Sequence, residues 1–448
     1  MAIALVLIAG FAATLAVNLP GQLSYDSVAQ LLDGRMGHYN TWHPPIMAWL
    51  LGIFDAMLAG SSLFVVFQAA LGFGALLSLL WLAPRPSWWV AIIALLLILT
   101  PQLLLYQGIV WKDVLFADAG LAGFAALAHA AQHWRRPKAR FALIVLAFVL
   151  FALAAMTRQN GVIVLGAGSI GFGLIAAKYR ERKARAIGYG VLAFFAGLAL
   201  AVSASIALAE RGDGGNGARA ELAMLQTYDM IGMLKAQPSL ALQKMHVADP
   251  ELEAAMRGDG ARLYSPVRND TFSASAALLQ AMSAAPNGLI FAQWLGMVRH
   301  HTFLYLKMRS RVFAWVFFTP DIIACRPVYT GIDGSAADLR SLGLTARIRP
   351  HDWALFDYAK HFDHTPVFSH PAFALLGAGV LYLLLRRHRP ADIALAFMLL
   401  AAFGFTASFL LASVACDYRY LYFLDLSVLA TILYLATDFP LQAKTAIP

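Results

Sequence analysis

Stretches of apolar residues long enough to cross a lipid bilayer recur along the whole chain. A transmembrane helix needs roughly 20 predominantly apolar residues to span a hydrocarbon core about 30 Å thick. Of the 448 residues, 60% are hydrophobic and 13% are charged, whereas a soluble domain carries about 25% charged residues. We therefore predict an all-α polytopic membrane protein with a bundle of about ten transmembrane helices. The predicted spans run over 2–19, 62–83, 88–105, 114–131, 141–156, 161–177, 187–209, 369–385, 391–413 and 421–437.

Basic residues gather in three short loops between these spans, at 135–140, 178–185 and 386–389. Cytoplasmic loops of membrane proteins are enriched in Lys and Arg. If the N-terminus is cytoplasmic, ten spans place all three clusters in the cytoplasm, together with Arg85 and Lys444. Topology and lipid contact then explain the formal charge of +9, so we expect membrane lipids and no nucleic acid among the partners.

Composition divides the chain into three parts. We predict an N-terminal transmembrane module over 1–209, an extracytoplasmic domain over 210–368 and C-terminal transmembrane helices over 369–448. Within the middle part, 288–320 alternates apolar stretches with basic residues, which favours helices lying on the outer leaflet. A pair of true spans there would leave the predicted orientation of all other spans unchanged, and it stays an alternative. The apolar stretch at 46–60 is too short to span and is predicted to lie in the interface.

The first predicted outer loop carries two acids on one helix. Ser24 is its predicted N-cap, and Asp26 and Asp33 stand about 10 Å apart along the axis. At that separation the two carboxylates do not share one metal ion unaided. Asp26 is then a candidate base and Asp33 a structural residue, the alternative being a solvated helix with incidental acids.

Lys112 and Asp113 lie where the third predicted span ends and the fourth begins. An ammonium group at the membrane boundary either extends to the lipid headgroups or holds a lipid phosphate. Asp113 beside it pairs with Lys112, binds a metal or caps the next helix, and the sequence leaves these three roles open.

Arg158 lies in a very short outer turn, while Asp417, Arg419 and Asp425 lie at the start of the last span. Charged groups near hydrocarbon are costly unless they are paired. These residues either bind substrate or form a structural ion pair, and only the fold decides whether they meet.

Two further sets of residues are weaker candidates. His351-Asp352 and His361-Phe362-Asp363-His364 contain metal-ligand types, but their spacing matches no specific metal motif, and we favour surface loops. Cys325 and Cys416 both fall on the outer side of the predicted topology, so a disulfide between them is chemically permitted.

The pattern resembles the GT-C superfamily of integral-membrane glycosyltransferases, which use polyprenyl-phosphate sugar donors and include the oligosaccharyltransferases. The resemblance rests on Tyr25-Asp26-Ser27, on His43-Pro44-Pro45, on the interfacial helix that follows and on Lys112-Asp113. Many members carry paired acids in the first loop, whereas Tyr25 and Ser27 flank Asp26 here. That departure leaves the metal and any other cofactor undefined.

The resemblance implies transfer of a sugar from a polyprenyl-phosphate donor to a glycan, lipid or protein of the cell envelope. Asp26 would be the catalytic base of an inverting displacement. Lys112, Arg158 and Arg419 would bind the donor phosphate, with Tyr25, His43, Asp113 and Asp417 in support. We expect the active site on the extracytoplasmic side of a bacterial inner membrane.

Two rival interpretations remain at this stage. A transporter or flippase would place Asp425, Arg158 and Asp113 along a pathway through the bilayer, with polar residues near its midplane. A glycan polymerase or ligase with a pyrophosphate-linked donor would need more basic residues around the leaving group, and 299–311 and 347–349 could supply them.

Overall fold

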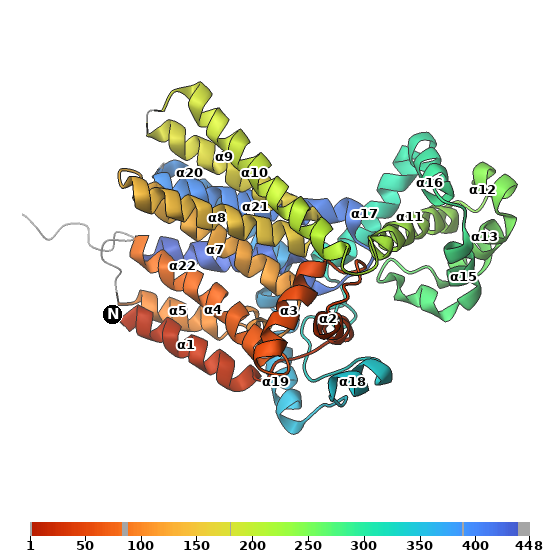
Figure 1. Cartoon of the computed structure of the whole chain (residues 1–448), viewed down its shortest axis with the longest axis horizontal. Helices are drawn as coiled ribbons and strands as arrows, with labels where there is room; N and C mark the ends of the chain where they lie inside the picture. Colours follow the sequence, from red (N-terminus) through yellow and green to blue (C-terminus); the bar gives the residue numbers. More distant parts are fainter. Residues whose placement is uncertain (1, 83–87, 180, 388, 438–448) are drawn as a thin grey trace, which may run out of the picture.

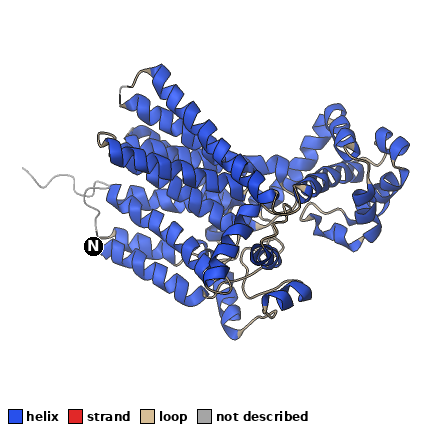
Figure 2. Ribbon diagram, viewed as in Figure 1, coloured by secondary structure: helices blue, strands red, loops and turns tan. Residues whose placement is uncertain are grey.

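The computed structural model describes residues 2–82, 88–179, 181–387 and 389–437, and within these ranges it contains helices and isolated β-bridges but no strand (Figure 2). The predicted all-α fold is confirmed. Arg85 and Lys444 lie outside the described residues. Ten helices run side by side in one bundle (Figure 1). They are α1 (Ala2–Asn18), α4 (Ser62–Leu79), α5 (Val90–Ile98), α7 (Lys112–Gln132), α8 (Pro137–Thr157), α9 (Val162–Lys178), α10 (Lys183–Ala209), α20 (His370–Arg387), α21 (Pro390–Ala412) and α22 (Tyr422–Thr437).

Seven helices among the described residues are long and apolar enough to cross a membrane, and one bent pair would make an eighth span. The bent pair is Val90–Ile98 with Pro101–Gly108, within the span predicted at 88–105. The two remaining predicted spans are both helical: α1 has only 17 residues, and the 18 residues of α20 include His370, Arg386 and Arg387. Both pack inside the bundle, α1 against α4 and α5 and α20 against α21 and α22.

Helix α7 forms the centre of the bundle. Buried residues make up 89% of its most apolar stretch, against 17% for α10 at the periphery. Its sequence is rich in Ala and Gly, and small residues let neighbouring membrane helices approach closely. Gly120 and Gly123 lie against the rings of Phe423 and Phe151, where an added Cβ would come within 2.8 and 2.5 Å of ring atoms. The residues at the start of α7 are thereby held on a rigid element.

A sharp bend precedes α7. After α5 the chain turns by 69° into α6 (Pro101–Leu104) and η2 (Tyr106–Gly108). Irregular backbone at membrane depth persists only where other groups satisfy its hydrogen bonds. Three side chains from other helices donate to its carbonyl oxygens: Asn18 to Leu104 at 2.7 Å, Gln68 to Gln107 at 3.2 Å and Ile109 at 3.1 Å, and Tyr422 to Gln102 at 2.8 Å.

The middle part of the chain occupies two places. Helices from α11 (Asn216–Ala236) to α16 (Leu289–His300) project from one end of the bundle, and α17 (Thr302–Phe318) leads back to it (Figure 1). This projection has its own hydrophobic core. Its other helices are α12 (Gln243–Ala248), α13 (Pro250–Ala255), η4 (Met256–Gly260), α14 (Ala261–Leu263), η5 (Asn269–Ala274) and α15 (Ala276–Ala284).

The rest of the middle part lies at the same end of the bundle but outside the projection (Figure 1). Helices α18 (Ala336–Leu342) and α19 (Pro350–Lys360) lie near α2 (Tyr25–Met36) and α3 (Pro45–Met57), and η6 (Pro366–Phe368) leads into α20. Helix α3 is the short apolar helix predicted at 46–60. Neither α16 nor α17 is among the described helices that are long and apolar enough to cross a membrane, and their predicted position on the outer leaflet stays a prediction. The boundaries at 209 and 368 stay predictions.

A disulfide joins Cys325, after α17, to Cys416, before η7 (Tyr418–Leu421), with 4.9 Å between the two Cα atoms. The backbone N–H of Tyr418 also donates to the carbonyl of Cys325 at 2.8 Å. These links fix the short segment that carries Arg419.

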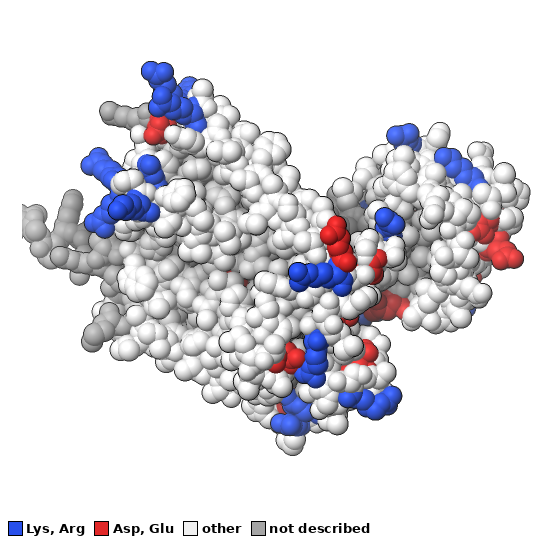
Figure 3. All heavy atoms as spheres, viewed as in Figure 1, with Lys and Arg blue, Asp and Glu red and all other residues white. Residues whose placement is uncertain are grey.

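The basic loops and the projection lie at opposite ends of the bundle. Lys and Arg side chains gather at the end where α7 meets α8 and α9 meets α10 (Figure 3). The first turns of α2 and α7 lie at the other end.

Helices α2 and α3 touch through backbone, and this contact yields a first prediction. A Cβ added to Gly34 would lie 2.2 Å from the carbonyl oxygen of Ala48 and 2.7 Å from the backbone nitrogen of Gly52. Because backbone atoms cannot move aside, Gly34→Ala should destabilise the protein by about 1–3 kcal/mol and lower Tm. Gly74→Ala on α4, where nothing lies within 4 Å of the new Cβ, is the matched control. Equal Tm values for the two variants would contradict this packing.

Candidate active site at one end of the bundle

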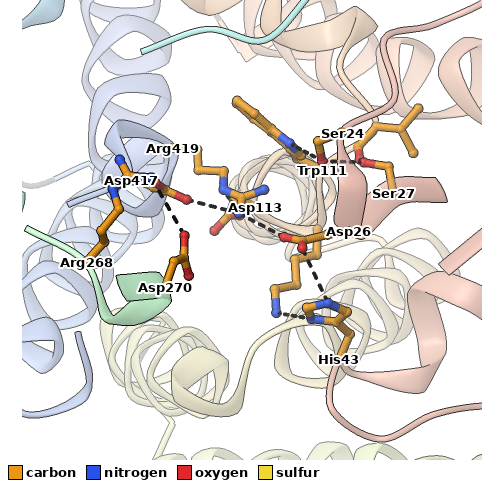
Figure 4. Close-up of polar contacts among 12 residues, drawn as sticks. Ser24, Asp26, Ser27, His43, Trp111, Asp113, Arg268, Asp270, Asp417 and Arg419 are labelled. Atoms are coloured by element: carbon orange, nitrogen blue, oxygen red, sulfur yellow. Dashed lines mark hydrogen bonds and ion pairs between the residues drawn. The ribbon is translucent and has the colours of Figure 1, made fainter. Parts of the chain in front are cut away.

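Charged side chains and one histidine from five segments meet at the end of the bundle opposite the basic loops. Figure 4 labels Asp26, His43, Asp113 and Arg419 among them. Asp26 lies in the first turn of α2 and Asp113 in the first turn of α7. His43 lies in the loop before α3, Arg158 between α8 and η3 (Gln159–Gly161), and Arg419 in η7. The sequence could not show that these groups converge, and the fold brings them together.

Arg419 lies at the centre of the cluster. Its Nη2 atom is 3.0 Å from Oδ2 of Asp26 and 3.1 Å from Oδ2 of Asp417, and its Nε atom is 3.7 Å from Oδ2 of Asp113. The guanidinium carbon lies 4.8 Å from the centre of the Trp111 ring, a cation–π geometry. One side chain therefore connects α2, α7 and η7.

Asp113 is the deepest acid of the cluster, with 2% of its side chain exposed. It forms an ion pair with Arg158, whose side chain is 9% exposed and whose guanidinium lies 4.9 Å from the ring centre of Tyr420. The sequence left the role of Asp113 open, with Lys112 among its candidate partners. Two arginines are the partners instead, because a buried carboxylate needs close opposite charge.

His43 bridges Lys112 and Asp26. Its Nδ1 atom lies 3.3 Å from Nζ of Lys112, and its Nε2 atom lies 3.7 Å from Oδ1 of Asp26. An ammonium group can only donate, so Nδ1 accepts and the proton of the neutral ring is on Nε2, facing Asp26. Burial, together with the charge of Lys112, lowers the pKa of His43 to about 3.

Asp26 is the accessible acid of the cluster. Its side chain is 36% exposed, compared with 14% for Asp417 and 2% for Asp113. Burial alone would raise the pKa of Asp26, but the charges of Arg419 and Lys112 and the hydrogen bond from Arg419 outweigh it and lower that pKa to about 2. Asp26 is therefore an ionised carboxylate at neutral pH with an oxygen that a substrate can reach.

Ser24 occupies the predicted N-cap position of α2, but its side chain makes no capping bond. Its hydroxyl lies 2.9 Å from that of Ser27 and accepts from Nε1 of Trp111 at 3.1 Å, and Ser27 donates to the carbonyl of Val110 at 2.5 Å. These bonds tie the turn that carries Asp26 to the segment that carries Lys112.

Sequence reasoning missed Glu221 of α11. It accepts a hydrogen bond from Nε2 of Gln159 at 2.6 Å. Burial raises the pKa of Glu221, while the nearby charges of Lys112 and Arg158 lower it. Asp213 clamps the start of α11 to the loop before His43, since it accepts from the hydroxyl of Thr41 at 2.7 Å. No sequence signal separates Glu221 from the other acids of the middle part.

Other acids that the sequence singled out lie outside the cluster. Asp425 pairs with His370 at 3.0 Å and accepts from the hydroxyl of Tyr418 at 2.7 Å, fully buried. Asp33 accepts from the backbone N–H of Asn40 at 3.3 Å. Tyr25, the neighbour of Asp26, is 57% exposed. Asp118 of α7, which the sequence analysis did not single out, is also buried and accepts from Gln107 at 2.8 Å.

The described residues contain no group of three or more His, Cys, Asp and Glu side chains arranged to hold a metal ion. Asp26 and Asp113 both face Arg419, and the predicted histidines have other contacts. His351 lies 2.6 Å from the carbonyl of Val17, and His361 lies 2.7 Å from that of Asp357. The described donor set does not fit a divalent cation, and no step below involves one.

Similar solved structures belong to the oligosaccharyltransferase of the archaeon Archaeoglobus fulgidus. Its complex with an inhibitory peptide and a dolichol-phosphate shares 13% identity at a TM-score of 0.42, over 96% of this chain and 49% of its own. Its complex with zinc and sulfate shares 15% identity at the same TM-score, over 96% of this chain and 48% of its own. The chain thus spans about half the length of these proteins. No protein-family model and no curated protein matches the chain.

The depressed pKa of His43 leads to a pH prediction. Below its ordinary pKa of about 6.5, the unfolded chain binds a proton that the folded protein does not bind, so His43 makes stability fall as pH falls. We expect the titration of His43 to lower the free energy of unfolding by about 1–2 kcal/mol between pH 6.5 and pH 5. His43→Gln should remove that part of the pH dependence of Tm, measured beside the parent protein. The same Tm slope in both proteins would contradict a neutral His43.

Proposed function

We propose that the protein is a membrane glycosyltransferase that moves a sugar from a polyprenyl-phosphate donor to a hydroxyl group of a cell-envelope glycan, lipid or protein. One observation carries the proposal: an accessible, ionised carboxylate lies among three cations at one end of a membrane-embedded bundle. The proposal rests on this chain's own residues, because a TM-score of 0.42 does not transfer function.

Lys112 is the cation best suited to a donor phosphate. Arg158 and Arg419 already face carboxylates, whereas no described carboxylate oxygen lies within 4.0 Å of the Lys112 ammonium, whose recorded partner is the uncharged His43. A phosphate could therefore bind Lys112 without displacing an acid. The arginines would add donors, since each guanidinium carries five N–H groups.

In the proposed step, the acceptor hydroxyl attacks the anomeric carbon as the bond from that carbon to the phosphate oxygen breaks. The electron pair of the broken bond leaves on the polyprenyl phosphate, where Lys112, Arg158 and Arg419 stabilise the charge. The hydroxyl proton moves to Asp26 and then to solvent. With a single displacement the sugar inverts its configuration, and one carboxylate suffices.

The position of the basic loops supports an extracytoplasmic site. Lys and Arg of short loops favour the cytoplasmic side, and they lie at the end of the bundle opposite Asp26 (Figure 3). We place the site on the outer face of a bacterial inner membrane, where the donor's lipid chain would lie between helices and its phosphate at the surface.

The transporter remains the rival hypothesis. It would use Asp425, Arg158 and Asp113, which pair with His370 and with each other, and other buried polar groups such as Asp118, Gln107 and Tyr422. Their contacts favour a structural role, because Tyr422 and Gln68 donate to backbone carbonyls of the bent segment. The ligase alternative would use basic residues from 299–311 and 347–349. Arg309 of the first stretch is fully buried in an ion pair with Asp229, and Arg347 of the second pairs with Asp352. Lys307 and Arg311 line a separate cavity.

Removing the charge of Asp26 tests the base. Asp26→Asn should lower turnover by about 10²- to 10⁴-fold, the usual contribution of a general base. The assay follows release of polyprenyl phosphate by purified protein in lipid. Asp33→Asn, on the same helix, is the matched control and should keep its activity. Undiminished turnover in Asp26→Asn would remove Asp26 from the mechanism, and substrate crossing sealed vesicles with no bond broken would favour a transporter.

Lys112 tests donor binding separately. Lys112→Gln should raise the KM for the donor about 10- to 100-fold, because hydrogen bonds to charged groups contribute about 1.5–3 kcal/mol. Lys112→Arg keeps the charge and should recover part of this loss. An unchanged KM in Lys112→Gln would show that the donor phosphate binds elsewhere.

A further inference from the structure

A second cluster of cations surrounds a cavity in the projection, apart from the site at Asp26. The cavity has a volume of about 370 Å³ and lies between α11, α17 and the turn at 264–266. Three of its lining residues are basic and none is acidic: Lys235 from α11, and Lys307 and Arg311 from α17. The proposed reaction uses none of these residues.

The cavity is shaped by close packing of Tyr264 on α11. A Cβ added to Gly232 would lie 2.8 Å from the Tyr264 ring, so glycine is what allows the ring to lie there. Lys235 donates to the carbonyl of Tyr264 at 3.0 Å and lies 5.9 Å from the ring centre. One cation is thus held in place against the wall of the cavity.

The other two cations have no protein partner in the described part of the chain. Lys307 and Arg311 are exposed and stand one turn apart on one face of α17. Asp229, a buried acid of α11, is already paired with Arg309 at 3.0 Å. The cavity therefore has unbalanced positive charge, which suits an anion.

Contacts of α17 place this cavity close to the membrane surface. Arg309, between the two cations in sequence, donates through Nε to the carbonyl of Leu410 at 2.9 Å, in the last turn of the spanning helix α21. Leu411 beside it is 53% exposed, and Phe303, one turn before Lys307 on the same face, is 82% exposed. Exposed aromatic and basic residues together on one helix are typical of a membrane interface.

We propose that this cavity binds the phosphate group of an anionic membrane lipid. The three cations supply donors for the phosphate oxygens, and the exposed apolar residues beside them lie where acyl chains begin. The proposal is independent of the glycosyl transfer proposed above, because it concerns different residues and needs no turnover.

The test measures lipid binding by the purified full-length protein with native mass spectrometry, using phosphatidylglycerol and the zwitterionic phosphatidylcholine. We expect preferential binding of phosphatidylglycerol, and binding about 30-fold weaker in the double variant Lys307→Gln/Arg311→Gln, since each surface cation contributes about fivefold near an anionic membrane. The matched control, Lys244→Gln/Arg299→Gln, removes two exposed cations that do not line the cavity, and it should bind as the parent protein does.

Two results would overturn the proposal. The first is equal binding of phosphatidylglycerol by the two double variants. The second is binding of inorganic phosphate, tested without lipid, as tightly as phosphatidylglycerol, which would assign the cavity to a free anion. Because the substituted side chains are exposed, both variants should fold, and an unchanged Tm checks that they do.

Discussion

The buried carboxylate of Asp113 constrains this end of the molecule more than any other group. It lies at the start of the most buried helix, with 2% of its side chain exposed, and faces Arg158 and Arg419. Leaving a buried charge without its partner costs about 3–5 kcal/mol. Arg158, in the turn after α8, and Arg419, in the segment before α22, therefore neutralise Asp113. Arg419 also pairs with Asp26 and so fixes the start of α2.

The position of that carboxylate depends on irregular backbone before α7. A straight helix from 90 onward would place Lys112 and Asp113 elsewhere, because the 69° bend decides where α7 begins. Polar side chains of α1, α4 and α22 satisfy the carbonyls that the bend leaves free. The buried polar side chains that a transport pathway would use thus bind the backbone of the bend, and the bend positions the site.

The site has a rigid base and an accessible side. Asp113 and Arg158 form the buried base, whereas Asp26, in the first turn of α2, and Lys112, the first residue of α7, are partly exposed. Helix α11 adds Glu221 from the projection, and the bond between Asp213 and Thr41 fixes the start of that helix.

The sequence by itself determined the membrane class, the positions of the apolar helices, the basic loops and the main polar residues, because charges that interrupt apolar stretches are costly and stand out in a single sequence. It also marked Asp26, Lys112, Arg158 and Arg419 one by one. Only the tertiary structure decided which of them meet. Asp26 and Arg419 are 393 residues apart in the sequence, and Asp113 pairs with two arginines and not with its neighbour Lys112. Glu221 and the bend before α7 left no sequence signal, because each depends on which distant side chains satisfy a buried charge or a free carbonyl. The basic residues of 299–311 are visible in the sequence, but only the fold shows that Lys307 and Arg311 line one cavity with Lys235.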